Sequence, residues 1–360
     1  MKRTMFLAFV LILASAVSCF AIGAGVGVRA TGMGGTGIAT ANDITAAYFN
    51  PAGLMYGPEN FEMQVFAGGT AGEIQALSDA ASDPDYLSKN FDEDLNISAA
   101  MNVGLGISAR KVGVTLLTNA GGVFIHPKSS ITSGQILAQA IAMAPLTLGS
   151  TFSTPGLPIA SMSVGVNLKP IQIYGGGVEV GPAVGTGTRL ETAGSGFGFD
   201  IGMQTKITPL ISFGAVVRNL SASYSTKTKS QGVTVATDGT MTDVGAETEI
   251  KSTDTLAPEI GVGVGFVVPI TGTLIAVDAE NYSVPDDKSY NDYHIGLEQG
   301  FLFNMVMLRA GYFTDGPTED TYYTYGLGLS AGPLNLGVAA ANSQVDMARS
   351  ISTAQIGLSF

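Results

Sequence analysis

Six ionisable residues have the clearest capacity for chemistry, and each lies next to an apolar residue in a stretch of alternating character. If these stretches are strands, all six side chains lie on the face opposite the apolar ones. Opposite charges on an enclosed face usually pair and brace the interior, and a carboxylate-binding site centred on Arg309 is the alternative. The six are Asp200, Glu259, Asp278, His294, Glu298 and Arg309.

Catalytic chemistry has little support in this sequence. The chain has two histidines and one cysteine, and it offers no Ser/His/Asp arrangement. Gly194-Ser195-Gly196 lacks the frame and the strand-to-helix context of a nucleophile elbow. Acidic clusters within 79–94 and 314–320 lack the spacing of a calcium loop and are expected to be solvated, with weak cation binding as the alternative. We predict no enzyme activity, no catalytic residue, no cofactor and no metal site.

Alternation with period two dominates the chain beyond residue 58, and it predicts strands. Glycine makes up 48 of the 360 residues, and only 13% are charged. Mean hydropathy is +0.32, yet no mature segment reaches the roughly 18 consecutive apolar residues of a membrane helix. We therefore predict an all-β transmembrane antiparallel barrel, and a soluble sandwich is the alternative. One apolar face consists of Ile97, Ala99, Met101, Val103, Leu105, Ile107 and Ala109.

The N-terminus has the pattern of a secretory signal peptide. Lys2 and Arg3 precede an apolar stretch over 5–17, and small residues allow cleavage after Ala21. Lipidation of Cys19 is the alternative. Removing residues 1–21 takes away two of the 17 basic residues and leaves 15 against 29 acidic ones, a balance of −14 that disfavours nucleic acid as a partner. We expect export to the outer membrane of a bacterial cell.

The spacing of turn residues predicts about 14 strands. Short and long connections alternate along the chain, as they do in outer-membrane barrels with both termini in the periplasm. The weakest predicted strand is near Ala144 to Ser153, and the segment from Ser133 to Ala144 is predicted to be helical within an outer loop. Long outer connections are expected at 69–95, 119–143, 172–194, 220–256, 282–290, 314–321 and 343–350.

The chain ends on an alternating stretch that closes with Phe360. A terminal aromatic residue on the last strand is typical of the signal that the barrel-assembly machinery recognises. We therefore expect that machinery to be a partner, and a packed side chain on the last strand is the alternative.

Two N-terminal motifs resemble the FadL/TodX superfamily of outer-membrane transporters, closest to its PorV-like and FadL-like branch. They are Arg29-Ala30-Thr31-Gly32-Met33-Gly34-Gly35-Thr36-Gly37 and Asn50-Pro51-Ala52-Gly53-Leu54. The resemblance implies a 14-stranded barrel over 59–360 and a hatch over 22–58 inside its lumen. It assigns the hatch role to Gly32, Gly34, Gly35, Asn50, Pro51 and Ala52.

The resemblance also implies a function. Members of this superfamily carry long-chain fatty acids or aromatic hydrocarbons, which bind an apolar pocket and leave sideways through a gap in the wall. We expect transport of such a hydrophobic ligand, with outer-membrane lipid around the barrel. The alternative is a PorV-like accessory barrel whose outer loops bind a partner protein. An open diffusion porin is disfavoured by the hatch, which serves either as a gate or as a passive plug.

Overall fold

The computed structural model describes residues 25–70, 95–109, 111–126, 134–153, 161–180, 185–236, 240–284 and 288–360. The predicted signal peptide and Cys19 lie outside these ranges. Within them, no helix combines the length and the apolar character needed to cross a membrane.

Sixteen strands form one antiparallel sheet. Short helices precede the first strand: α2 (Val28–Gly32), α3 (Ala46–Phe49) and η2 (Pro51–Tyr56), while η3 (Met347–Arg349) precedes the last. The strands are β1 (Glu62–Thr70), β2 (Leu95–Ala109), β3 (Val112–His126), β4 (Gly134–Met143), β5 (Leu146–Phe152), β6 (Ser161–Val180), β7 (Thr186–Thr208), β8 (Ile211–Val235), β9 (Met241–Thr255), β10 (Glu259–Val267), β11 (Leu274–Val284), β12 (Lys288–Phe301), β13 (Val306–Asp315), β14 (Asp320–Ala331), β15 (Leu334–Ser343) and β16 (Ile351–Ser359).

The sheet closes on itself because β1 pairs with β16 as well as with β2. Its 16 strands occupy 14 positions. In one position, β4 and β5 follow each other between β3 and β6; in another, β9 and β10 follow each other along β8. The predicted 14-stranded barrel is therefore confirmed. The rim where β1 begins and β16 ends carries the short connections, and we call it the short-turn rim.

Alternation sorts the side chains between the two faces of this wall. On β2 the odd positions point outward, so Leu105 is 44% exposed, whereas Phe66 on the inner face of β1 is 1% exposed. Large apolar side chains thus cover the exterior, and glycine and polar residues line the interior. A continuous apolar exterior of this kind suits lipid and would be a liability in water.

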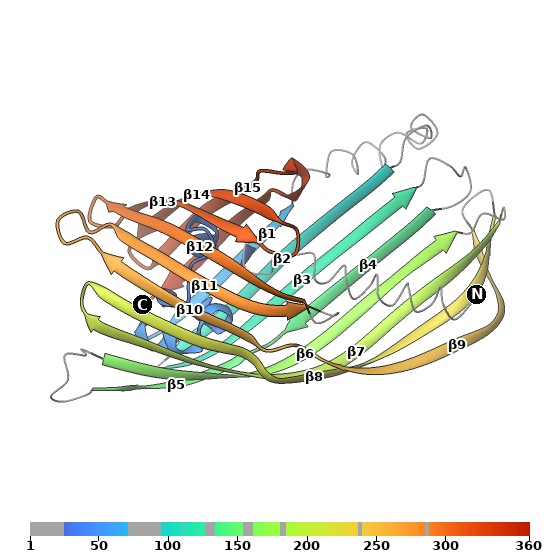
Figure 1. Cartoon of the computed structure of the whole chain (residues 1–360), viewed down its shortest axis with the longest axis horizontal. Helices are drawn as coiled ribbons and strands as arrows, with labels where there is room; N and C mark the ends of the chain where they lie inside the picture. The colour runs from blue at the N-terminus through green and yellow to red at the C-terminus, as the bar shows by residue number, and fades with distance from the viewer. Residues whose placement is uncertain are drawn as a thin grey trace.

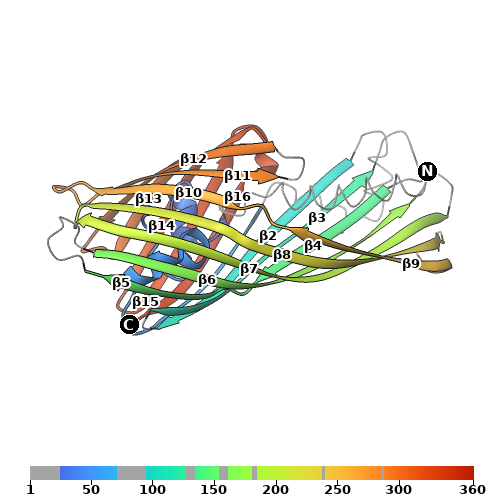
Figure 2. The same cartoon turned by 60° about the horizontal axis from the view of Figure 1, so that its bottom comes forward.

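The wall is much taller on one side than on the other. β7 has 23 residues and β8 has 25, whereas β13 has 10. Figures 1 and 2 show the ends of β2, β3, β4, β6, β7, β8 and β9 that are remote from the short-turn rim projecting to the right, past the rest of the barrel, and we call this projection the extension. Among the described residues, β9 pairs with β8 alone, and both of its faces are exposed.

Several predicted outer loops are strands of this extension. The ranges 172–194 and 220–256 belong largely to β6, β7, β8 and β9, so their prediction as loops was wrong. Outside the lipid, outward positions can be Ser, Thr or Lys, and the apolar alternation that marks a strand disappears. The predicted helix at Ser133–Ala144 was also wrong, because 134–143 form β4. There apolar residues point to both faces, which conceals the period of two.

Two interruptions mark the wall. Between β4 and β5, Pro145 stands opposite Thr115, and Ala144 stands opposite Pro170. Thr115 donates its N–H to Pro145 and Ala144 to Pro170, both at 3.1 Å, but neither proline can return the bond. On β8, Phe199 pairs with Ser221 and Ile201 with Val217, so β8 carries two more residues than β7 there. Such bulges bend a strand.

Candidate functional site

The N-terminal segment, residues 25–58, lies inside the barrel, where Figure 1 shows it in blue. Most of its residues are buried, and its short helices are joined by tight turns. Gly34 and Gly35 have φ angles of 66° and 78°, a conformation that favours glycine. A Cβ atom on Gly34 would lie 2.5 Å from the backbone oxygen of Ile295 on β12, so the chain passes directly against the wall.

Inward glycines of the wall make this close contact possible. An added Cβ at Gly214 on β8 would lie 2.0 Å from the Ile38 oxygen. At Gly311 on β13 the added atom would lie 2.3 Å from the Gly34 nitrogen, and at Gly32 it would lie 2.9 Å from Gly326 of β14. The inner face is thus rich in glycine because the segment's backbone occupies the space where side chains would project.

The Asn50-Pro51-Ala52 motif anchors the segment to β6 and β7. The Asn50 side chain donates to the backbone oxygens of Ile38, at 2.8 Å, and Met203, at 2.9 Å. Its oxygen accepts from the Ala52 N–H at 3.1 Å, which caps η2, with Pro51 at the start of that helix. One side chain therefore fixes two turns of the segment and joins them to the wall.

A carboxylate shared by two arginines provides a second anchor. Glu298 on β12 accepts from Arg29 of the segment at 2.9, 3.0 and 3.2 Å, and from Arg309 on β13 at 2.7 Å. Burial opposes the charge on Arg29, but Glu298 outweighs burial, and the pKa of Arg29 lies above its ordinary value. Arg29 also donates to the Thr40 oxygen at 2.8 Å, so this cluster ties α2 to both a wall strand and a later turn.

Asp278 and His294 hold the glycine-rich turn. They face each other on β11 and β12. Asp278 accepts from the backbone N–H groups of Gly37, at 2.7 Å, and Ile38, at 2.9 Å. His294 Nδ1 lies 2.7 Å from the Gly34 oxygen, and because a carbonyl only accepts, Nδ1 is the donor. Two wall residues thus bind the backbone of the segment over 34–38 through hydrogen bonds.

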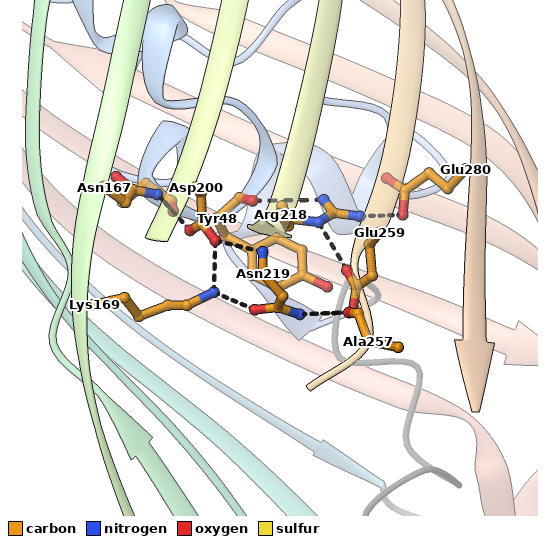
Figure 3. A network of polar contacts seen from close by, with 10 residues as sticks. Tyr48, Asn167, Lys169, Asp200, Arg218, Asn219, Ala257, Glu259 and Glu280 are labelled. Atoms are coloured by element: carbon orange, nitrogen blue, oxygen red, sulfur yellow. Dashed lines mark hydrogen bonds and ion pairs between the residues drawn. The ribbon is translucent and has the colours of Figure 1, made fainter. Parts of the chain in front are cut away.

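A larger polar network links β6, β7, β8, β10 and β11 to α3 (Figure 3). Asp200 accepts from Asn167 at 2.9 Å, from Lys169 at 2.8 Å and from the Asn219 N–H at 2.8 Å. Asn167 also donates to the Ala47 oxygen of the segment at 2.8 Å. This half of the network therefore joins three wall strands to α3.

Arg218 is the centre of the other half. It bonds Glu259 at 2.9 Å and Glu280 at 2.5 Å, and its guanidinium lies 5.1 Å from the ring centre of Tyr48. Burial raises the pKa of Tyr48, so its hydroxyl stays neutral. Asn219 joins the two halves by donating to Glu259 at 3.4 Å.

All six sequence-predicted ionisable residues lie on the inner face, in three separate groups. The structure brings Glu298 together with Arg309, and Asp278 together with His294, whereas Asp200 and Glu259 belong to the network of Figure 3. These contacts fit the bracing interpretation. Sequence reasoning missed Lys169, Arg218 and Glu280, although the alternation that places Gly214 inward also places Arg218 inward.

Two hollows lie outside this packed interior. The larger, about 860 Å³, is apolar and is lined by consecutive positions of β1, β2, β3, β4 and β6, outward ones such as Met101 and Tyr174 and inward ones such as Ala100 and Gln139. The smaller, about 160 Å³, lies between the segment and the short-turn rim, beside Arg29, Tyr56, Gln204 and Lys206. Residues of both faces of the wall therefore line the larger hollow.

Comparison with known proteins identifies the fold. No protein-family model matches the sequence, and a search of the curated proteins finds no match. Among solved structures, the toluene transporter TodX of Pseudomonas putida is similar at TM-score 0.66 and 13% identity, over 93% of this chain and 99% of TodX. The toluene transporter TbuX of Ralstonia pickettii has a TM-score of 0.62 at 12% identity, over 92% of this chain and 96% of TbuX.

A FadL homologue of Pseudomonas aeruginosa has a TM-score of 0.60 at 9% identity, with 93% of this chain and 98% of that protein covered. Similarity at such low identity establishes the fold, and it extends over nearly the whole of each chain. The chain therefore has the closed 14-stranded fold of the FadL/TodX-type outer-membrane transporters.

Proposed function

We propose that this protein moves hydrophobic small molecules across the bacterial outer membrane and that the N-terminal segment is its hatch. The observation that carries the proposal is the seating of that segment inside a lipid-facing barrel by ion pairs, hydrogen bonds and glycine contacts. Such contacts can break and re-form without covalent change. The overall likeness to toluene transporters supports a hydrophobic solute.

The interruption between β4 and β5 is the proposed sideways exit. Pro145 and Pro170 each remove one ladder hydrogen bond, on opposite sides of the same strand position. The segment packs behind this point, because the Thr115 hydroxyl donates to the Ile44 oxygen at 3.3 Å. A shift of the hatch would therefore uncover a part of the wall that lacks two ladder hydrogen bonds.

The test is uptake of radiolabelled toluene and of a long-chain alkane by cells that contain or lack the protein. We expect faster uptake only with the protein, and slower uptake when Pro145→Ala and Pro170→Ala are combined, because both strands regain their donors. A matched control is Pro333→Ala in the β14–β15 turn. Equal uptake of both solutes with and without the protein would remove the transport proposal, and wild-type uptake by the double variant would remove only the exit.

Both ends of the chain have a role in this proposal. Residues 1–21 serve for export, and Phe360 serves as the assembly signal. Phe360 donates its N–H to the Phe61 oxygen at 2.9 Å, and the two rings are 6.4 Å apart, so the last residue completes the seam between β16 and β1. Deletion of Phe360 is expected to lower the amount of folded protein in the membrane, measured by heat-modifiable mobility in gels.

A second candidate function is binding of a protein partner through the extension. It is favoured by β9, a strand of 15 residues with both faces exposed and one described neighbour. An edge of this kind can accept an added strand. Native mass spectrometry separates the candidates: co-purified hydrophobic molecules support transport, and a stoichiometric protein that is lost on substitution of Thr248→Pro supports the partner.

A further inference from the structure

We propose that the passage selects solutes by charge, accepting uncharged or cationic hydrophobic molecules and rejecting carboxylates such as fatty-acid anions. This inference rests on the proposed transport function. It concerns whether this chain admits fatty-acid anions or only solutes without a negative charge. The evidence is the position of the charged side chains on the inner face and the groups that pair with them.

Two inward cations, Lys169 and Arg218, are already bound by protein carboxylates. Lys169 Nζ lies 2.8 Å from Asp200, and the Arg218 guanidinium lies 2.9 Å from Glu259 and 2.5 Å from Glu280. The Lys169 side chain is 9% exposed and that of Arg218 is 5%. Figure 3 shows the two cations within one network that has three carboxylates. A solute carboxylate would have to displace a protein carboxylate from a buried pair.

Further toward the rim opposite the short turns, the inner face becomes more acidic. Asp292, Asp315 and Asp320 are buried on β12, β13 and β14. Neutral donors hold two of them: Asp292 accepts from the Tyr282 hydroxyl at 2.9 Å and the Gly316 N–H at 2.7 Å, and Asp320 accepts from the Ser343 hydroxyl at 2.5 Å. Neutral donors stabilise a carboxylate without cancelling its charge. A solute that enters from this rim therefore meets negative potential first.

Arg349 leaves the excess of carboxylates at this rim in place. Arg349 on η3 contacts Asp346 at 3.9 Å, and its side chain is 43% exposed, so it is both engaged and solvated. Its charge also acts on Asp315, so one partly solvated cation faces three carboxylates. Within the described residues, this part of the lumen thus has more carboxylates than cations.

The cations toward the short-turn rim do not give a solute carboxylate a free binding partner at its entry. Arg29 and Arg309 share Glu298, with Asp43 close enough to raise the pKa of Arg29 further. Lys206 lies 4.4 Å from the ring centre of Tyr56, beside the small hollow at the short-turn rim. A solute reaches Lys206 only after it has passed the hatch, so Lys206 cannot admit an anion.

A matched series of eight-carbon compounds tests this inference. Radiolabelled octanol, octanoate and octylamine carry charges of zero, minus one and plus one at pH 7.5 and share one hydrocarbon chain. Their binding is measured by equilibrium dialysis against the full chain in nanodiscs, with the value for empty nanodiscs subtracted. We expect octanoate to bind at least about tenfold more weakly than octanol, and octylamine to bind at least as tightly as octanol.

A gain-of-binding variant sharpens the test. Combining Glu259→Gln and Glu280→Gln frees Arg218, and the ratio of octanoate affinity to octanol affinity should rise about tenfold. The single variant Glu280→Gln leaves Arg218 paired and should give a smaller rise in the same direction. Glu247→Gln on the exposed face of the extension is the matched control and should change neither affinity.

The outcomes separate the two proposals. Octanoate binding as tight as octanol binding in the wild-type protein would overturn charge selection and leave the transport proposal standing. Binding of none of the three compounds above the empty-nanodisc value would remove both proposals. An unchanged octanoate affinity in the correctly folded double variant would also overturn charge selection, because the freed Arg218 must then play no part.

Discussion

Replacing Glu298 by Gln should loosen the N-terminal segment without unfolding the barrel. The substitution keeps the shape of the side chain but removes the charge that holds Arg29 and Arg309 together. The Glu298 side chain is 7% exposed and that of Arg309 is 9%, so the two guanidinium groups would face each other with little water between them. Arg29 can respond by leaving the wall, because it belongs to the segment and not to a strand.

The size of the effect follows from the burial of this cluster. Removing one partner of a buried ion pair costs about 3–5 kcal/mol. We take the lower value because the Arg29 side chain is 23% exposed and water screens part of the loss. About 3 kcal/mol corresponds to a roughly hundredfold larger population of the undocked segment.

Hydrogen–deuterium exchange in lipid nanodiscs measures that population peptide by peptide. Amides over 25–58 should exchange up to about a hundredfold faster in Glu298→Gln, whereas amides of β13 and β14 should keep their protection. The control is Glu247→Gln, which breaks a pair with Lys229 at 3.0 Å in which both side chains are 46% exposed. Such exposed pairs contribute about 0–1 kcal/mol, so the control should match the wild-type protein.

The reasoning is refuted if the segment in Glu298→Gln exchanges at the wild-type rate while the protein remains folded. In that case the hatch would be held by its glycine contacts and backbone hydrogen bonds, and the arginine cluster would contribute nothing to docking. Faster exchange throughout the barrel would refute a different step, the assumption that the segment undocks independently of the wall.

Three further substitutions, two of them paired with a control variant, test other contacts. Gly214→Ala should displace the segment, because its Cβ would lie 2.0 Å from a backbone oxygen, whereas Gly357→Ala, whose nearest neighbour would be at 3.4 Å, should be tolerated; exchange over 25–58 distinguishes them. Asn50→Asp should raise that exchange about tenfold or more, because a carboxylate cannot donate to the two carbonyls that Asn50 now binds. Leu105→Arg should lower the free energy of unfolding in lipid by about 2–4 kcal/mol, whereas Ser223→Arg on the extension should leave it unchanged in urea titrations.

The lipid-facing wall could be predicted because lipid imposes a simple rule on it. Outward positions such as Leu105 and Val262 must be apolar, so the period of two is visible in the sequence. The extension follows no such rule. On β9 both faces contact solvent, and its Thr, Glu and Lys residues resemble those of a loop. The prediction for β4 was wrong for the opposite reason, because apolar residues on both of its faces also fit a helix.

The candidate site was only partly visible in the sequence. Alternation was enough to assign Glu298 and Arg309 to one face, but their contact depends on strand register. The links from Asn50 to Met203 and from Arg218 to Glu280 join residues far apart in the chain, and register and the path of the segment decide them. Local patterns contain neither kind of information, and the resemblance to a family marked Asn50 without indicating what it contacts.

The tall strands have a mechanical consequence. β8 reaches as one strand from the short-turn rim to the far end of the extension, and 25 residues at about 3.3 Å each give it a length of roughly 80 Å. Up to Arg218, β8 pairs with β10, and from Ser223 onward it pairs with β9. The bulge of β8 at Asn219 lies between these two parts. A load applied to the exposed tip would bend the strand at that joint. Such a bend would move the residues of the network that contact the N-terminal segment.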